Sequence, residues 1–219
     1  MAKTRYPQLC ALARAAEIVG ERWTLLIVRE LLLGPCRFTD IRKRLDGVSA
    51  SVLAERLLRL EEASVIARRL LDPPAASMVY ELTATGRALE PAVHELLKWG
   101  ARFMIPARPK DRVEADWLRL ALTACARKNP SPARSYLLRL RRSRGEVLLR
   151  VAGGAGGTVV DDAAGPAEAT IVAEPRAILS LMSGVLAPRA AIRDGTVSVD
   201  GDVTALDDFP ALFDVSVMR

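Results

Sequence analysis

The fold of the first half of the chain is decided by residues 34–61, GPCRFTDIRKRLDGVSASVLAERLLRLE. Before Asp46-Gly47, apolar residues recur at helical spacing, which predicts a short helix whose opposite face is basic. Asp46-Gly47 predicts a turn, after which Ser49 is placed to cap a second helix that runs to about Glu62. Leucines line the inner face of this second helix. Its outer N-terminal face is small and polar: Ser49, Ala50, Ser51 and Ala54.

The residues on both sides of this stretch predict the remaining parts of a winged helix-turn-helix. Two helices precede it, one ending at Gly20 and one capped by Thr24 and apolar on nearly every side. Two runs rich in Val, Ile and Tyr follow it and predict a hairpin, and Thr83 then begins a long helix with an apolar stripe. The predicted ranges are helices 8–19, 24–33 and 83–103 and strands 65–71 and 78–82.

The second half predicts a separate domain, so that the fold class of the whole chain is α+β. Residues 106–114 have the Pro and charge content of a linker, which gives a winged helix-turn-helix domain over 1–105 and an α+β domain over 115–219. Gly153–Gly157 has neither the Lys and Ser/Thr of a phosphate loop nor a following helix, which favours a hairpin turn. The predicted helices are 113–127, 175–185 and 206–215, and the strands are 135–140, 146–152, 169–174 and 196–203.

Charge is distributed unevenly along the 219 residues. Residues 1–109 hold 17 Lys and Arg against 12 Asp and Glu, residues 110–150 hold 11 against 4, and residues 151–219 hold 4 against 10. The basic front suggests a polyanion as partner, although such a balance also occurs in chains that are merely soluble. No apolar run reaches the roughly 18 residues of a membrane span, and the N-terminus lacks a secretion signal, so we expect a cytoplasmic protein without membrane contact.

Four features of the first half occur together in a fixed order. They are Cys10, Trp23 within RWTLLIVREL, the helix pair quoted above, and YELTATGRAL ahead of Trp99. In this combination the chain resembles the HxlR family of winged-helix regulators, a branch of the MarR-like group. The resemblance implies a homodimer whose fourth helix enters the major groove of double-stranded DNA while the hairpin touches the backbone or the minor groove. The chain departs from the family at the wing, where Ala75 and Ala76 follow the paired prolines in place of a basic residue.

The residues expected to bind DNA form two groups. The small residues of the fourth helix would let it approach base edges, and the serine hydroxyls can bond them. Basic side chains around the helix would anchor phosphates, with two at the base of the hairpin substituting for the missing wing-tip charge. The expected anchors are Arg37, Arg42, Lys43, Arg44, Arg56, Arg68 and Arg69. The alternative interpretation of the helix is an ordinary solvated face.

Residues 168–206, EATIVAEPRAILSLMSGVLAPRAAIRDGTVSVDGDVTAL, contain a strand pattern, a helix ending in LMSG and a hairpin of the form DG-x-V-x-V-x-G. Through this stretch, residues 115–219 are similar to the sterol carrier protein type 2 domain, whose family members hold lipids or other apolar molecules in a cavity between sheet and helices. The similarity implies a cavity for an apolar small molecule. Its expected lining is Leu122, Tyr136, Leu138, Leu148, Ile171, Leu179, Met182, Phe209 and Phe213. The alternative is a filled core, because any core needs aliphatic residues at such spacing.

Three cysteines and one histidine remain as candidates for a catalytic, redox or metal-binding role. The cysteines are too widely spaced for a disulfide framework or a zinc signature, and no nucleophile, phosphate-loop or metalloprotease motif occurs. We therefore expect no metal, no cofactor and no enzyme activity. Cys10 occupies a position where some HxlR-like regulators have a redox-sensing thiol, but we favour a small buried core residue. We expect His94 at the surface or in a dimer interface.

These patterns predict a homodimeric transcriptional regulator that binds an inverted-repeat operator, with an apolar small molecule as a candidate modulator. The dimer is expected because the apolar flanking helices, Leu9–Val19 and Leu89–Phe103, have surface left to bury. The alternative is a lipid or small-molecule carrier whose winged helix mediates protein contacts.

Overall fold

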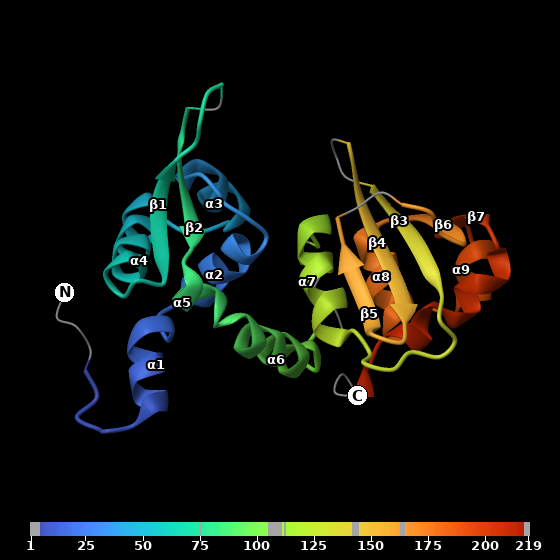
Figure 1. Ribbon diagram of the computed structural model, residues 1–219, viewed down its shortest axis with the longest axis horizontal. Helices are drawn as coiled ribbons and strands as arrows, with labels where there is room; N and C mark the ends of the chain where they lie inside the picture. Colours follow the sequence, from blue (N-terminus) through green and yellow to red (C-terminus); the bar gives the residue numbers. More distant parts are fainter. Residues whose placement is uncertain are drawn as a thin grey trace. The chain divides into compact units, whose positions relative to one another are not determined.

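Four helices, a hairpin and a one-turn helix make up the first part of the chain (Figure 1). The computed structural model describes residues 5–74, 76–104, 111, 113–141, 145–162 and 165–216, and its contacts divide the chain into the units Met1–Val93 and His94–Arg219. The predicted linker over 106–114 falls outside the described residues, apart from Asp111, Val113 and Glu114. Among the described helices, none is long and apolar enough to cross a membrane. The elements of the first unit are α1 (Ala11–Val19), α2 (Thr24–Leu32), α3 (Phe38–Arg44), α4 (Ala50–Glu62), β1 (Ile66–Leu70), β2 (Met78–Leu82) and α5 (Ala84–Arg87).

The order of these elements confirms the predicted winged helix-turn-helix. Leu53, Leu57 and Leu60 of α4 are almost completely buried, as their spacing predicts, and α4 packs against β1 while α2 packs against β2. The hairpin is antiparallel, with Ile66 opposite Leu82 at its base. The apolar stripe of α4 thus fixes which of its faces is left exposed.

The predicted cap of α2 is wrong. Trp23 occupies the N-cap position with a φ of 78°, in the left-handed region that few residues other than glycine adopt. Thr24 instead lies in the first turn of the helix with 2% of its surface exposed. The chain therefore makes a tight bend between α1 and α2.

The single long helix predicted from Thr83 is also wrong, because a break separates α5 from α6 (Glu90–Ala101). Pro91 accounts for the break. Proline has no N–H with which to continue a preceding helix, but it fits well in the first turn of a new one. The same sequence pattern therefore forms two helices.

Gly86 of α5 lies against the end of the α4–β1 connection, and we expect Gly86→Ala to destabilise the protein by about 3 kcal/mol. A Cβ atom at this position would overlap the backbone carbonyl of Val65 and come within 2.9 Å of Leu82 Cδ2. Gly100→Ala is the matched control, because no atom lies within 4 Å of its Cβ position and alanine favours a helix. Urea unfolding of both variants measures the difference, and equal stabilities would contradict the close packing at Gly86.

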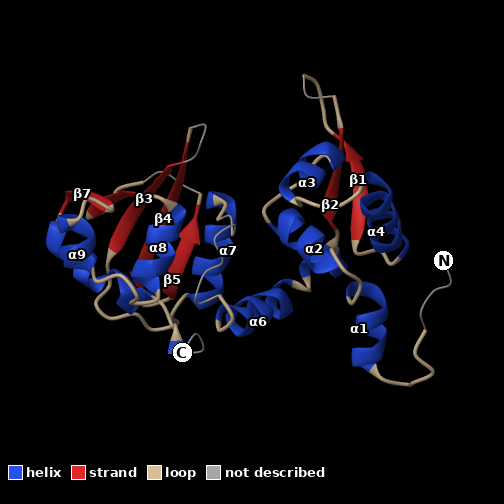
Figure 2. Cartoon of the chain, turned by 180° about the vertical axis from the view of Figure 1, so that it is seen from behind, coloured by secondary structure: helices blue, strands red, loops and turns tan. Residues whose placement is uncertain are grey.

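The second unit is built on a five-stranded sheet with the order β5-β4-β3-β6-β7, in which all neighbours are antiparallel except β3 and β6. Side chains alternate between buried and more exposed along β3 and β6, and α8 lies across the buried face (Figure 2). The predicted α+β class is confirmed, and the glycine-rich segment forms the predicted turn between β4 and β5. The elements are α7 (Ala115–Cys125), β3 (Ser135–Arg141), β4 (Glu146–Gly154), β5 (Gly157–Asp161), β6 (Ala169–Ala173), α8 (Pro175–Met182), α9 (Pro188–Arg193), β7 (Val197–Gly201) and the 3₁₀ helix η1 (Val203–Leu212).

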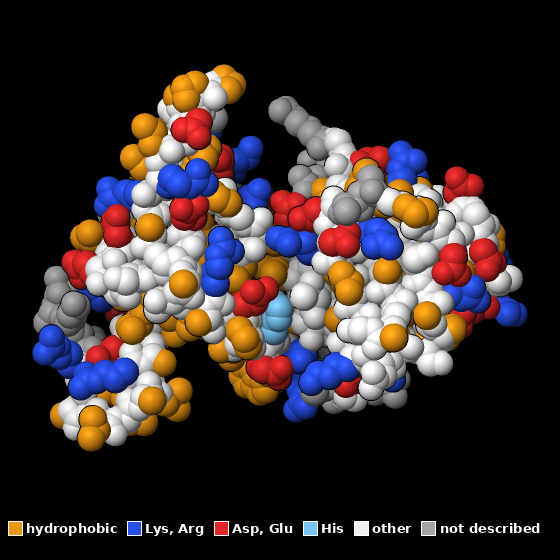
Figure 3. All heavy atoms as spheres, in the orientation of Figure 1, with side chains coloured by type: hydrophobic (Ala, Val, Ile, Leu, Met, Phe, Trp, Pro, Cys, Tyr) orange, Lys and Arg blue, Asp and Glu red, His pale blue; other side chains and the backbone are white. Residues whose placement is uncertain are grey.

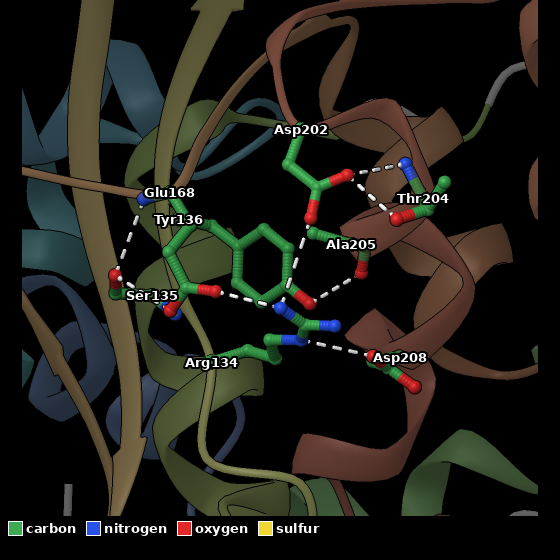
Figure 4. Close-up of polar contacts among 8 residues, drawn as sticks. All are labelled: Arg134, Ser135, Tyr136, Glu168, Asp202, Thr204, Ala205 and Asp208. Carbon is green, nitrogen blue, oxygen red and sulfur yellow. Dashed lines mark hydrogen bonds and ion pairs between the residues drawn. The ribbon is translucent and has the colours of Figure 1, made fainter.

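Arg134, just ahead of β3, ties three parts of the second unit together (Figure 4). Its Nη1 donates to Glu168 Oε2 over 2.8 Å and its Nε donates to Asp208 Oδ2 over 2.9 Å, while Asp202 Oδ2 lies 3.7 Å from Nη1. Next to this cluster, the Tyr136 hydroxyl donates to the carbonyl of Ala205 over 2.6 Å. One guanidinium thus joins the start of β3 to η1 and to the residue before β6.

This arrangement makes stability depend on pH in the acid range. The hydrogen bond from Arg134 lowers the pKa of Glu168, and the hydrogen bonds from Thr204 lower the pKa of Asp202. Carboxyls with lowered folded-state pKa values stabilise the fold above their unfolded pKa and lose that contribution as the pH falls through the folded pKa. We expect the melting temperature to fall between about pH 5 and pH 3, and less steeply in Arg134→Met. Arg193→Met, at an exposed ion pair, should keep the wild-type slope, and identical slopes for all three proteins would contradict this role of Arg134.

Candidate nucleic-acid interface

The N-terminal end of α4 presents the predicted small, polar face. Ser49 is the N-cap, as predicted, and its Oγ accepts a hydrogen bond from the backbone N–H of Val52 over 3.2 Å. The Ser51 hydroxyl lies 3.1 Å from the Ser49 hydroxyl. Because the leucine face is held in the core, these residues are exposed: Ser49, Ala50, Ser51 and Ala54.

The basic side chains of α3 and its N-cap fall into two groups. Arg37, Arg42 and Lys43 are exposed, and none of them forms an ion pair with a described residue. Arg44 instead lies 3.4 Å from the carboxylate of Glu30, whose side chain is fully buried and also accepts from Arg29 over 2.6 Å. Three cations of this segment are therefore available to an anion outside the chain, and a fourth also serves the buried Glu30.

The remaining predicted anchors all form ion pairs inside the unit. Arg68 donates to Glu61 over 2.7 Å and Arg69 donates to Glu81 over 2.9 Å, although both arginines remain about half exposed. Arg56 differs more from the prediction, because only 12% of its side chain is exposed and it is paired with Glu21 at 2.8 Å. Sequence reasoning missed Glu21, since a partner 35 residues away leaves no local spacing signal.

The wing carries apolar side chains toward its tip. Leu70 and Met78 face each other across the hairpin and are 63% and 49% exposed. Figure 3 shows hydrophobic side chains gathered at this end of the hairpin. This agrees with the departure from the family at Ala75 and Ala76, of which Ala75 lies outside the described residues. In the two strands of the hairpin, Arg68 and Arg69 are the basic residues.

The three thiols lie in different environments. Cys10 is exposed, so the expectation of a buried core residue is wrong. Burial raises the pKa of the Cys36 thiol and raises that of Cys125 to about 11, which keeps both protonated at neutral pH. No group of three or more His, Cys, Asp or Glu side chains among the described residues is placed to hold a metal ion.

Most of the predicted ligand-lining residues of the second unit lie together in its core. The rings of Tyr136, Phe209 and Phe213 pack edge to face, with centroids 5.2 Å apart in both pairs. Leu179 is only partly buried, and the placement of Leu148 is wrong: it is 38% exposed, while Leu149 is buried. A shift of one residue along a strand moves a side chain to the other face of the sheet, and the apolar run around Leu148 has no alternation to indicate which residue points inward.

Two family models match the chain. One, described as HxlR-like helix-turn-helix, matches residues 18–108, which include α2 to α6. The other, described as SCP-2 sterol transfer family, matches residues 116–214, which include the five-stranded sheet. Both matches agree with the resemblances seen in the sequence.

Curated relatives agree with the first model. The HTH-type transcriptional regulator YvaP of Bacillus subtilis is 37% identical over 94 residues, which are 43% of this chain and 87% of YvaP. YodB, an HTH-type transcriptional regulator of the same organism, is 35% identical over 42% of this chain and 82% of its own length. The structure of reduced YodB covers 46% of this chain and all of the YodB chain, at 32% identity and a TM-score of 0.40. The chain belongs to the HxlR-like helix-turn-helix family of transcriptional regulators.

Proposed function

We propose that the chain is a DNA-binding transcriptional regulator that acts as a homodimer on an inverted repeat, with α4 in the major groove. The observation that carries this proposal is the exposed small face of α4, which follows closely on the cations of α3 in the chain. Small side chains let a helix approach base edges, and cations without a protein carboxylate can bind phosphates. We assign DNA binding to residues 1–105, and a regulatory or dimer-supporting role to residues 115–219. Such a protein works in the cytoplasm and needs no enzyme activity.

Exposed apolar side chains support the homodimer. On and before α1, Leu9 and Leu12 are 106% and 76% exposed. On α6 and just after it, Trp99 and Phe103 are 59% and 68% exposed, with their rings in edge contact at 5.0 Å. Large apolar side chains that stand exposed in this way are typical of an interface. A second copy of the chain would bury both helices and supply the second α4 that an inverted repeat requires.

Fluorescence polarisation with a duplex from the promoter region of the protein's own gene tests DNA binding. We expect sequence-preferring binding that weakens steeply with salt, because phosphate contacts release counterions. Arg42→Ala should weaken binding to all duplexes alike and reduce the salt slope by about one unit. Absence of binding at low salt would overturn the proposal and favour an apolar-molecule carrier, the candidate that the SCP-2 match supports.

An apolar small molecule is the candidate modulator of the second domain. Tyr136, Phe209 and Phe213 are fully buried with their rings in contact, so a ligand that entered this part of the core would have to displace them. Titration with a fluorescent fatty acid, repeated in the presence of DNA, tests this role. Displaceable binding that changes the DNA affinity supports a sensor. If no displaceable binding is found, the domain has only a supporting role in the dimer.

A further inference from the structure

Two arginines on α4 point away from its exposed small face and toward the bend between α1 and α2. Arg56 Nη2 donates to Glu21 Oε2 over 2.8 Å, and its Nε donates to the backbone carbonyl of Arg22 over 3.3 Å. Arg59 Nη1 lies 3.5 Å from Glu21 Oε1, and its Nη2 donates to Glu55 Oε1 over 2.8 Å. Arg56 Nη1 also lies 3.3 Å from Glu55 Oε1. We call Glu21, Glu55, Arg56 and Arg59 the charge cluster.

The charge cluster is balanced and partly shielded from solvent. Two guanidinium groups face two carboxylates, and the exposed fractions of the side chains are 12% for Arg56, 24% for Arg59, 34% for Glu55 and 37% for Glu21. Partly buried ion pairs are screened by salt much less than exposed ones. Arg56 is therefore committed to Glu21, and its guanidinium does not face outward as a phosphate anchor would.

The bend that carries Glu21 has a constrained backbone. The N–H of Gly20 donates to the carbonyl of Ala16 over 2.9 Å, and a Cβ atom at Gly20 would approach that carbonyl oxygen to 2.5 Å. Trp23, on the other side of Glu21, has the left-handed φ of 78° that begins α2. The backbone on both sides of Glu21 is thus constrained, so the charge cluster connects α4 to a fixed point of the fold.

We propose that Glu21 and Arg56 are positioning residues for DNA recognition: they hold α4 in the orientation in which its small N-terminal face meets base edges, and neither touches the DNA. This inference rests on the proposed role of α4. It replaces the expectation that Arg56 anchors a phosphate. Loss of the contact would let α4 tilt. The tilt would lower the preference for one DNA sequence over another, and it would affect the sequence-independent attraction to phosphates much less.

Glu21→Gln separates positioning from simple electrostatics, because the two predict changes in different quantities. Removing a negative charge should strengthen binding to every duplex if only the net charge matters. If Glu21 positions α4, the ratio of affinities for a selected duplex over a scrambled one should instead fall about tenfold. The duplex is selected from a random library by the wild-type chain. Glu62→Gln is the matched control, since it removes the same charge from α4 outside the charge cluster.

Arg56 variants extend the test. Arg56→Lys keeps the charge but loses the planar fork, so it should lower the affinity ratio while leaving the salt slope unchanged. The double variant Glu21→Gln/Arg56→Met should have an affinity ratio no lower than that of the more affected single variant. The reason is that both substitutions remove the same contact. Melting temperatures within a few degrees of wild type show that the fold is kept.

The outcomes keep this inference apart from the proposed function. A wild-type chain that selects no duplex would overturn the proposed function itself. A selective wild-type chain with an unchanged affinity ratio in both Glu21→Gln and Arg56→Lys overturns the positioning role alone. A salt slope that falls by about one unit in Arg56→Met would show instead that Arg56 contacts a phosphate.

Discussion

Ser51→Glu and Ala54→Glu are each expected to weaken binding to a selected operator duplex at least about hundredfold while leaving the melting temperature nearly unchanged. Both positions are exposed on the face of α4 that we place in the major groove. A carboxylate there meets the phosphate backbone with the same sign of charge, and its bulk keeps the helix away from base edges. The fold should tolerate both changes, because neither side chain is buried and an acid at position 51 lies in the first turn of α4, where the helix dipole favours it.

A smaller substitution on the same face of α4 and a glutamate on another element separate the effect of a lost hydroxyl from the effect of an added charge. Ser51→Ala removes only a hydroxyl and should cost about tenfold in affinity if that hydroxyl bonds a base. Ser198→Glu places the same charge at an exposed serine of β7 and should bind as wild type. Fluorescence polarisation and thermal melting measure all four variants. Wild-type affinity in both α4 glutamate variants would show that another surface of the chain meets DNA.

The elements of the fold that rest on local periodicity could be predicted from the sequence. The buried leucines of α4 follow from their spacing, and the Ser49 cap follows from residue type and position. The hairpin was predicted to within a residue at each end because its strands are rich in Val, Ile and Tyr between turn residues. The small β5 and α9 were missed, since a few residues beside glycines and a proline give no periodic signal.

The contacts that depend on tertiary structure could not be predicted in this way. Arg56 has the sequence context of a phosphate anchor, yet the fold brings Glu21 to it across 35 residues. From residue type alone, both would be expected to be solvated charges on the surface. Cys10 is the opposite case, a residue expected to be buried that is exposed. Cysteine is usually buried, but Cys10 lies just before α1, where no described element covers it. A site built from residues on separate elements is therefore visible only once the elements are packed.

Leu12→Asp is expected to raise the dissociation constant of the homodimer at least about hundredfold and to reduce operator binding with it. Leu12 is 76% exposed within α1, although its neighbour Ala13 is buried and Val19 is partly buried. If a second copy buries this leucine, an aspartate would bring an unpaired charge into an apolar interface, and such a charge is among the most costly changes an interface can suffer. DNA affinity should fall because a single winged helix reads only half of an inverted repeat.

Light scattering at micromolar concentration distinguishes the dimer from the monomer. Val185→Asp is the matched control, since it places the same charge at a residue of the second unit that is 67% exposed and lies outside the proposed interface. The wild type and this control should be dimers while Leu12→Asp is a monomer with an unchanged melting profile at high dilution. A monomeric wild type would contradict the dimer. A dimeric Leu12→Asp would remove α1 from the interface and leave α6, with Trp99 and Phe103, as the surface to which a second copy binds.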